Sequence, residues 1–230
     1  MLHLSTIAFT QARLDEHSIV KDSSGLQYDY AVWSALMRTG DYTVRGRTAA
    51  DGTMNYLLRK LTPEEKDARA AAAPKPAESR FFTTGGKVAS FSAKDLEGNK
   101  YKLKDLEGKI VVMNFWFVGC PPCRMEIPEL NRVADAYKNN PDVVFLAIAL
   151  DEKWTIEDFL KKIPFHYHIV DDGRYIAQNN YGITTYPTHL VLDRRGIVRF
   201  HTTGYAMGTV AWVKKTIDAL LAEGTGTAAK

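Results

Sequence analysis

The chain has 230 residues, of which 45% are hydrophobic and 25% charged, and its formal net charge is +3. This composition is typical of a folded, water-soluble protein. The small net charge disfavours a nucleic-acid partner, and no apolar run reaches the roughly 18 to 20 residues that a membrane span requires. The length allows one domain of about 150 residues together with a smaller extension.

The first residues carry a short apolar run, 2–9, which Thr10, Gln11 and Ala12 follow. Two interpretations stay open for residues 1–12. They are either the remnant of a secretory signal whose basic start is missing, or a frayed N-terminus.

Residues 13–79 are predicted to form a small α+β extension that carries no catalytic motif. Apolar spacing and turn residues predict a strand, a helix and two further strands, at residues 18–21, 28–38, 42–45 and 54–61. The function of this extension stays open.

A connector helix is predicted after the extension. It starts at Thr62 and Pro63, because the threonine can cap the helix and Glu65 can complete a capping box. The helix continues into an alanine-rich, mostly solvated run that ends before Pro74. The domain boundary is expected between residues 73 and 80.

Residues 80–222 are predicted to form an α/β domain, because strands and helices alternate along them. Strands are predicted at residues 91–93, 100–103, 110–116, 143–150, 166–170, 188–192 and 197–201. Helices are predicted at residues 123–139, 155–162, 174–181 and 210–221. The last two strands read as an antiparallel hairpin, and residues 223–230 are expected to be a disordered tail.

Cys120 and Cys123 are the only cysteines of the chain, and they lie in one Cys-Pro-Pro-Cys sequence. A disulfide framework would need further, widely spaced cysteines, and a tetrahedral zinc site would need more ligands. A redox-active dithiol needs only these two residues. A structural disulfide and a metal half-site are the alternatives to it.

The predicted strand before this pair and the predicted helix after it give the cysteines a reason to be reactive. Free N–H groups and the positive end of the helix dipole stabilise a thiolate, which lowers the thiol pKa below its usual value of about 8.5. We expect Cys120 to be exposed and to attack a disulfide, and Cys123 to be more buried and to resolve the mixed disulfide. Pro121 and Pro122 fit the first helical turn, where missing amides do no harm.

The segment VVMNFWFVGCPPCRMEIP, residues 111–128, resembles the active-site segment of the thioredoxin superfamily, in particular its TlpA/ResA-like branch of bacterial extracytoplasmic thiol-disulfide oxidoreductases. The resemblance extends over roughly residues 87–222, and it includes Pro128, a mid-helix proline that would bend the helix. It implies an α/β, thioredoxin-like fold with a mixed central sheet flanked by helices, in addition to the small N-terminal α+β extension.

The resemblance also implies roles for three further residues. The sequence Thr185-Tyr186-Pro187-Thr188 resembles the family's cis-proline loop, so Pro187 is expected to be cis and, with Tyr186, to line the substrate groove. Without the resemblance a trans turn would be expected. Glu126 lies three residues after Cys123, where ResA-like proteins keep a glutamate near the dithiol, and it is expected to exchange a proton with Cys123. The alternative is a solvent-facing glutamate.

Two positions depart from the related sequences. Gly119 stands where the family more often has tryptophan, which is expected to remove an aromatic wall and open the groove. Asn114 stands where cytosolic thioredoxin has a buried aspartate, which agrees with the TlpA/ResA branch, where asparagine is usual, so more of the proton transfer is expected to fall to Glu126. Phe117 stands where peroxiredoxin-like peroxidases carry a catalytic threonine, which disfavours that activity.

Histidines could in principle hold copper or zinc. His166 and His168 share a strand face, and His189 follows the proline loop. Their spacing repeats no metal signature, so ordinary sheet histidines are preferred. We expect no metal and no cofactor.

The sequence therefore predicts a thiol-disulfide oxidoreductase that exchanges its dithiol with disulfides of exported proteins, more as a reductant than as an oxidant. The resemblance implies an extracytoplasmic, for instance periplasmic, location in a bacterial envelope and a link to cytochrome c maturation. The expected partners are cysteine-containing envelope proteins and an upstream thiol-disulfide electron donor, with no nucleic acid and no membrane span in this chain. The alternative is a chaperone that binds copper or another metal through the same cysteines.

Overall fold

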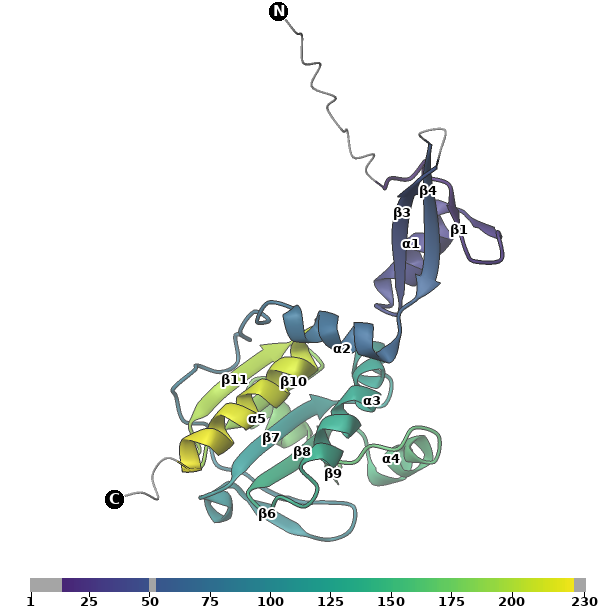
Figure 1. The fold of residues 1–230 in the computed structure, drawn as a ribbon. Helices are drawn as coiled ribbons and strands as arrows, with labels where there is room; N and C mark the ends of the chain where they lie inside the picture. Colours follow the sequence, from purple (N-terminus) through teal and green to yellow (C-terminus); the bar gives the residue numbers. More distant parts are fainter. Residues whose placement is uncertain (1–13, 50–52, 226–230) are drawn as a thin grey trace, which may run out of the picture. The chain divides into compact units, whose positions relative to one another are not determined.

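The computed structural model describes residues 14–49 and 53–225, and the chain divides into two compact units after Ala68 (Figure 1). The signal remnant or frayed end expected at residues 1–12 lies outside the described residues.

The N-terminal unit contains a four-stranded sheet with one helix packed on it. In the sheet order β2-β1-β4-β3, β1 and β4 run parallel and the other neighbours antiparallel. The strands are β1 (Val20–Lys21), β2 (Gln27–Tyr28), β3 (Tyr42–Thr48) and β4 (Met54–Lys60). Helix α1 (Tyr30–Arg38) begins after Asp29, whose carboxylate accepts a hydrogen bond from an amide of the first turn. Trp33 of α1 packs with Val20 and Leu58 of the sheet.

Helix α2 (Pro63–Ala72) starts with the predicted capping box. The Glu65 amide donates to Thr62 Oγ1 at 3.2 Å, and the Thr62 amide donates to Glu65 Oε2 at 3.1 Å. Arg59 of β4 donates hydrogen bonds to the same carboxylate and, as the largest cause, lowers the pKa of Glu65 to about 2. The local sequence signal for this helix start is confirmed.

The second unit is built on a five-stranded mixed sheet in the order β11-β10-β7-β8-β9. Strands β7, β8 and β9 are parallel, whereas β10 runs antiparallel to β7 and to β11. Their bounds are β7 (Ile110–Trp116), β8 (Val143–Ala149), β9 (His168–Val170), β10 (Thr188–Leu192) and β11 (Val198–Thr203). A small antiparallel hairpin, β5 (Ser92–Lys94) and β6 (Lys100–Lys102), precedes a short 3-10 helix, η1 (Leu103–Leu106).

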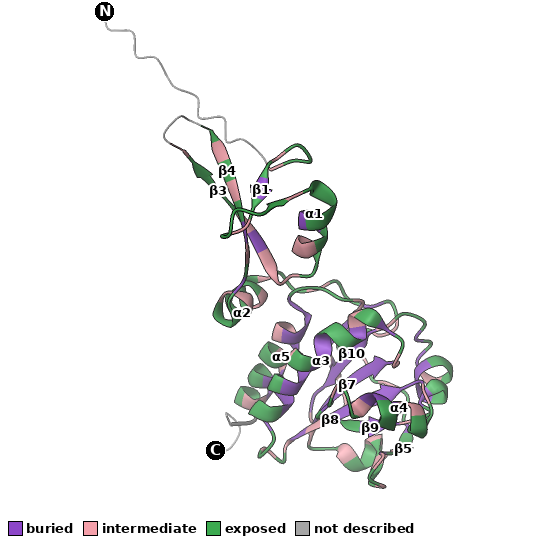
Figure 2. Ribbon diagram, turned by 90° about the vertical axis from the view of Figure 1, so that its right-hand side faces the viewer, coloured by how far each residue is buried: buried purple, intermediate pink, exposed green. Residues whose placement is uncertain are grey.

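Helices cover both faces of this sheet, as the mixed, helix-flanked architecture expected from the sequence requires. They are α3 (Pro121–Ala136), α4 (Lys153–Leu160), α5 (Thr209–Thr225) and the π-helix η2 (Tyr175–Asn180). Helices α3 and α5 lie side by side on one face, over Val112, Trp116 and Val191 (Figure 1). Phe115 and Leu190 point to the other face and pack with η2. The strands between these layers are largely buried (Figure 2).

The connector between the units is bonded to the second unit, although the sequence assigned it to the extension and predicted a solvated segment. Side chains of α5 reach it, since Lys215 donates to the Ala71 carbonyl at 2.6 Å and Trp212 Nε1 to the Ala73 carbonyl at 3.0 Å. From β11, Thr202 Oγ1 donates to the Ala77 carbonyl at 2.8 Å, and His201 Nδ1 accepts from the Ser79 amide at 3.1 Å. Residues 69–79 therefore form a strap along this unit.

Residues 223–225 were predicted to belong to a disordered tail, but they are part of helix α5. Helix α5 continues through Thr225, because Arg199 of β11 donates hydrogen bonds to both carboxylate oxygens of Glu223, at 3.0 and 2.6 Å. The remainder of the predicted tail, residues 226–230, lies outside the described residues.

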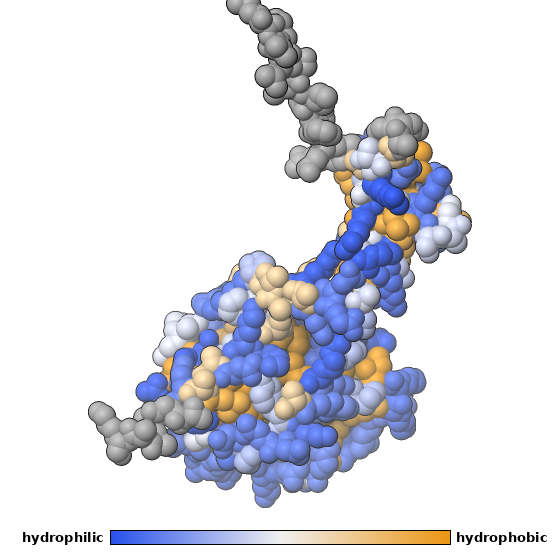
Figure 3. All heavy atoms as spheres, viewed as in Figure 1, coloured by the Kyte–Doolittle hydropathy of each residue, from blue (hydrophilic) through white to orange (hydrophobic). Residues whose placement is uncertain are grey.

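Hydrophilic side chains cover most of the face of the second unit that Figure 3 shows, with apolar side chains in patches between them. Exposed large apolar side chains of this unit include Met125, Trp154, Tyr205 and Met207. Within residues 14–49 and 53–225, no helix combines the length and the apolar character that crossing a membrane requires.

Leu190 of β10 is fully buried, so Leu190→Ala should leave a cavity in the second unit and lower its free energy of unfolding by about 2 to 5 kcal/mol. Urea unfolding followed by circular dichroism measures this loss. The control is Tyr175→Ala, because Tyr175 is 68% exposed and its removal should change stability by only about 0.5 kcal/mol. Equal effects of the two substitutions would contradict the assigned core.

Candidate active site

Cys120 and Cys123 are joined by a disulfide, with their Cα atoms 5.3 Å apart. Cys120 is the N-cap residue of α3, and its Sγ accepts a hydrogen bond of 3.2 Å from the Cys123 amide. The dithiol predicted from the sequence therefore lies at a helix N-terminus, in its oxidised form.

Two prolines leave a single amide facing the N-cap sulfur. Pro121 and Pro122 occupy the first positions of α3 and carry no amide hydrogen. A helix N-terminus normally offers several unpaired N–H groups, but here the Cys123 amide is the first of them, and it points at Cys120 Sγ. A thiolate at this position is stabilised by that N–H group and by the helix dipole.

Cys120 is buried in the disulfide form, so the expected exposure of this sulfur is wrong for this state. Only 2% of the residue is exposed, against 3% for Cys123. Both cysteines belong to the apolar cluster on the α3 face of the sheet, against which Phe117, Val118 and Tyr186 also pack. The helix-end pattern locates Cys120 along the chain but does not reveal the side chains that pack around it.

The Tyr186–Pro187 peptide bond is cis, which confirms what the resemblance implied. Pro187 comes directly before β10, whose first residue, Thr188, pairs with Phe115 near the end of β7. Because antiparallel strands start where their neighbours end, the proline loop lies at the same edge of the sheet as the cysteines. The structure thus brings both loops together.

Two aromatic rings connect these loops. Phe117 and Tyr186 meet edge to face, with ring centroids 5.6 Å apart. Gly119 is exposed, and a Cβ atom there would lie 3.6 Å from the Phe117 ring, which is an ordinary contact. Gly119 supplies no aromatic side chain here, but the Phe117–Tyr186 pair does. This edge of the sheet, beside the cysteines, therefore keeps an aromatic surface.

Glu126 is buried, with 1% of its surface exposed, so the alternative of a solvent-facing glutamate is wrong. Its Oε2 lies 2.8 Å from His189 Nε2. Its Oε1 is also buried and has no hydrogen-bond partner among the groups that the structure describes. The glutamate follows Cys123 by one helical turn in α3, the helix that also contains Pro128 as expected.

His189 and Asn114 complete this polar contact, although no role beside Glu126 was predicted for either of them. His189 on β10 pairs in register with Asn114 on β7, and His189 Nδ1 lies 3.3 Å from Asn114 Nδ2. Both side chains face α3, and at most 2% of either residue is exposed. One signal in the sequence could have predicted this contact. Asn114 and His189 are polar residues within mainly apolar strands, and buried polar groups need hydrogen-bond partners.

The other two histidines lie apart from His189. His166 Nδ1 is 2.9 Å from an Asp135 carboxylate oxygen, and His168 Nδ1 is 3.3 Å from Asp95. Asp95 also accepts hydrogen bonds from the Asn99 side chain and amide, which close the turn between β5 and β6. The three histidines of the sequence analysis therefore do not share one site.

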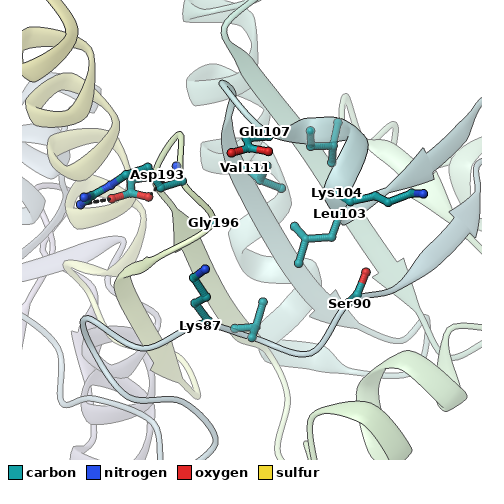
Figure 4. Close-up of a pocket in the computed structure, with 11 residues that line it drawn as sticks. Lys87, Ser90, Leu103, Lys104, Glu107, Val111, Asp193 and Gly196 are labelled. Carbon is teal, nitrogen blue, oxygen red and sulfur yellow. Dashed lines mark hydrogen bonds and ion pairs between the residues drawn. The ribbon is translucent and has the colours of Figure 1, made fainter.

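A hollow of about 320 Å³ lies at the other end of the sheet (Figure 4). Lys87, Lys104, Glu107 and Asp193 line it and give it charges of both signs. Its wall includes Val111 at the start of β7, whereas the cysteines follow the end of that strand. The hollow is therefore not part of the dithiol site.

Known proteins are similar to the part of the chain that contains this site. A model of the AhpC/TSA family matches residues 84–201, which are more than half of the chain and lie within the second unit. The thiol-disulfide oxidoreductase ResA of Halalkalibacterium halodurans is 32% identical over 129 residues, which are 56% of this chain and 73% of that protein. The chain belongs to the AhpC/TSA family. Within it, the chain is a ResA-like thiol-disulfide oxidoreductase.

Solved structures share the fold of the second unit. A protein described as the thiol:disulfide interchange protein DsbE of Chlorobium tepidum matches with a TM-score of 0.55 and 27% identity, over 61% of this chain and 99% of that chain. The thioredoxin domain of a thiol-disulfide oxidoreductase from Bacteroides vulgatus matches with a TM-score of 0.51 and 22% identity, over 60% of this chain and 97% of that chain. The expected thioredoxin-like fold is confirmed.

One hydrogen bond ties the ResA-like cysteine loop to the segment after β8. The Val118 amide donates to Asp151 Oδ2 at 2.7 Å. Asp151→Ala should speed hydrogen–deuterium exchange of residues 117–120 by about tenfold or more, because hydrogen bonds to charged groups contribute roughly 1.5 to 3 kcal/mol. Asp158→Ala is the control, since Asp158 pairs with Lys161 and Lys162, which are exposed and lie directly after its own helix. Unchanged exchange in the Asp151 variant would show that this tether does not hold the loop.

Proposed function

We propose that this ResA-like enzyme reduces disulfides of exported proteins through Cys120 and Cys123. The observation that carries the proposal is the position of Cys120 as N-cap of α3, where one amide donates to its sulfur. That position favours a thiolate, which is the nucleophile of disulfide exchange.

In the proposed reaction the Cys120 thiolate attacks one sulfur of a client disulfide. A mixed disulfide forms, and the other client sulfur leaves as a thiolate. Cys123 then attacks Cys120 Sγ, the second client sulfur leaves, and two electrons have passed to the client. The chain is left with its own disulfide, and an upstream dithiol returns the electron pair.

Three further residues have roles in this proposal. Glu126 accepts the thiol proton of Cys123 and returns it, because a buried carboxylate one turn away from the sulfur is suited to general acid–base chemistry. Tyr186 and Pro187 line the groove in which the client chain lies. The contact between Phe117 and Tyr186 supports this arrangement, because it joins the groove to the cysteine loop.

The clients in this proposal are cysteine-containing envelope proteins, such as c-type cytochromes, whose haem-binding cysteines would be reduced. The proposed location of the enzyme is extracytoplasmic. Apolar side chains near the dithiol support a polypeptide client. Met125 on α3 and Met207 are both 48% exposed. Met207 lies in the loop that the Gly204 amide ties to the Pro187 carbonyl at 2.8 Å. The names of the relatives support thiol chemistry but name no client.

The test uses the full chain with insulin as client and dithiothreitol as electron donor. Cys120→Ser should reduce insulin no faster than dithiothreitol alone, because the attacking thiolate is lost. Cys123→Ser should keep the first attack and accumulate a mixed disulfide visible by mass spectrometry. Lys104→Ala, at the opposite end of the sheet, is the matched control and should act as the unchanged chain does.

The direction of electron flow is measured separately, by equilibrium with glutathione. A reductant is expected to have a potential near that of thioredoxin, about −270 mV, rather than near that of DsbA, about −120 mV. A cysteine pair that neither dithiothreitol nor glutathione changes would overturn the proposed function. Stoichiometric copper in the reduced protein, lost in Cys123→Ser, would support the metal-binding alternative instead.

A further inference from the structure

Glu126, His189 and Asn114 form a continuous polar contact across three elements of the second unit. The glutamate comes from α3, the histidine from β10 and the asparagine from β7, and none is more than 2% exposed. A buried carboxylate is stabilised as an anion only where a hydrogen-bond donor or an opposite charge faces it. His189 Nε2 lies 2.8 Å from Glu126 Oε2 and is the hydrogen-bond partner of this carboxylate.

The asparagine amide also contacts the imidazole of His189. The Asn114 amide nitrogen lies 3.3 Å from Nδ1 and 3.5 Å from Nε2, so it packs beside both ring nitrogens. The contact of His189 Nε2 with Glu126 Oε2, at 2.8 Å, is the shorter one, and a carboxylate oxygen accepts, so Nε2 donates to Glu126.

The second oxygen of Glu126 is left for the dithiol. Oε1 is buried and has no hydrogen-bond partner within the described part of the chain. Cys123 lies three residues earlier on α3 and therefore on the same side of the helix. Tyr167 is the other titratable group near Glu126; burial first, and then the charge of Glu126, raise the pKa of Tyr167, so its hydroxyl stays protonated.

We propose that His189, packed against Asn114, is a positioning residue that holds Oε2 of Glu126 and so turns Oε1 toward the thiol of Cys123. This inference rests on the dithiol exchange proposed above and assigns its proton route.

The proposed step balances protons and electrons. The S–H bond of Cys123 breaks and an O–H bond forms at Glu126 Oε1. Cys123 Sγ bonds to Cys120 Sγ while the bond between Cys120 and the client sulfur breaks, and the client leaves as a thiolate with the electron pair. The proton returns to Cys123 when the upstream dithiol reduces the disulfide.

Rapid mixing of the reduced full chain with Ellman's reagent separates the two thiols. Attack by Cys120 releases one thionitrobenzoate, and closure of the disulfide by Cys123 releases a second. The rate of each phase is followed across pH. The first phase tests the proposed function, and the second phase tests the role of His189.

His189→Leu should slow the second phase about tenfold near pH 7 and move its pH midpoint up by about one unit, since one unit corresponds to a tenfold change. The first phase should stay unchanged. His189→Gln, whose amide can still donate to Glu126, should keep the original midpoint, whereas the shorter His189→Asn should not. In a Glu126→Gln background, His189→Leu should slow the second phase no further, because the histidine acts through the glutamate.

The matched control is His201→Leu, because His201 is also 1% exposed but lies on the opposite face of the sheet. Its second phase should be normal. If His189→Leu leaves the second phase unchanged, or slows it equally without Glu126, the inference is overturned. If the leucine variant does not fold, identical pH profiles for the Gln and Asn variants overturn it. Absence of a first phase in the unaltered chain would instead contradict the proposed function.

Discussion

The antiparallel register between β7 and β10 is the constraint on which the site depends. This pairing sets Thr188 opposite Phe115 and His189 opposite Asn114. Since β7 ends shortly before the cysteines and β10 begins directly after Pro187, one ladder of hydrogen bonds brings both loops to one edge of the sheet. A slip by one residue would turn His189 to the other face, away from α3.

The polar contact under the dithiol is costly to build in an apolar cluster. Moving an isolated charge from water into a protein interior costs several kcal/mol of free energy. A polar network with unsatisfied hydrogen-bond groups is less stable than an apolar core. Glu126 has a partner on Oε2 but none on Oε1 among the described groups. An acceptor left open inside a well-packed core is expected where the group works rather than where it only stabilises.

Local signals in the sequence predicted much of this arrangement, and long-range packing accounts for the rest. The cysteine pair and the capping box of Thr62 and Glu65 each involve residues within a stretch of four, so the local sequence was enough to predict both. The contact between Glu126 and His189 joins residues 63 positions apart, and no sequence period reports it. The burial of Cys120 has the same origin, because other segments pack around it after the helix has formed.

The strap of residues 69–79 belongs to the second unit, so this unit begins before the segment that resembles known proteins. The family match starts at residue 84, so a fragment designed from similarity alone would omit the strap. Such a fragment would remove the acceptors of Trp212, Lys215 and Thr202 and the donor to His201. A shortened chain that keeps the strap would therefore retain these contacts, which makes residues 69–79 part of the second unit.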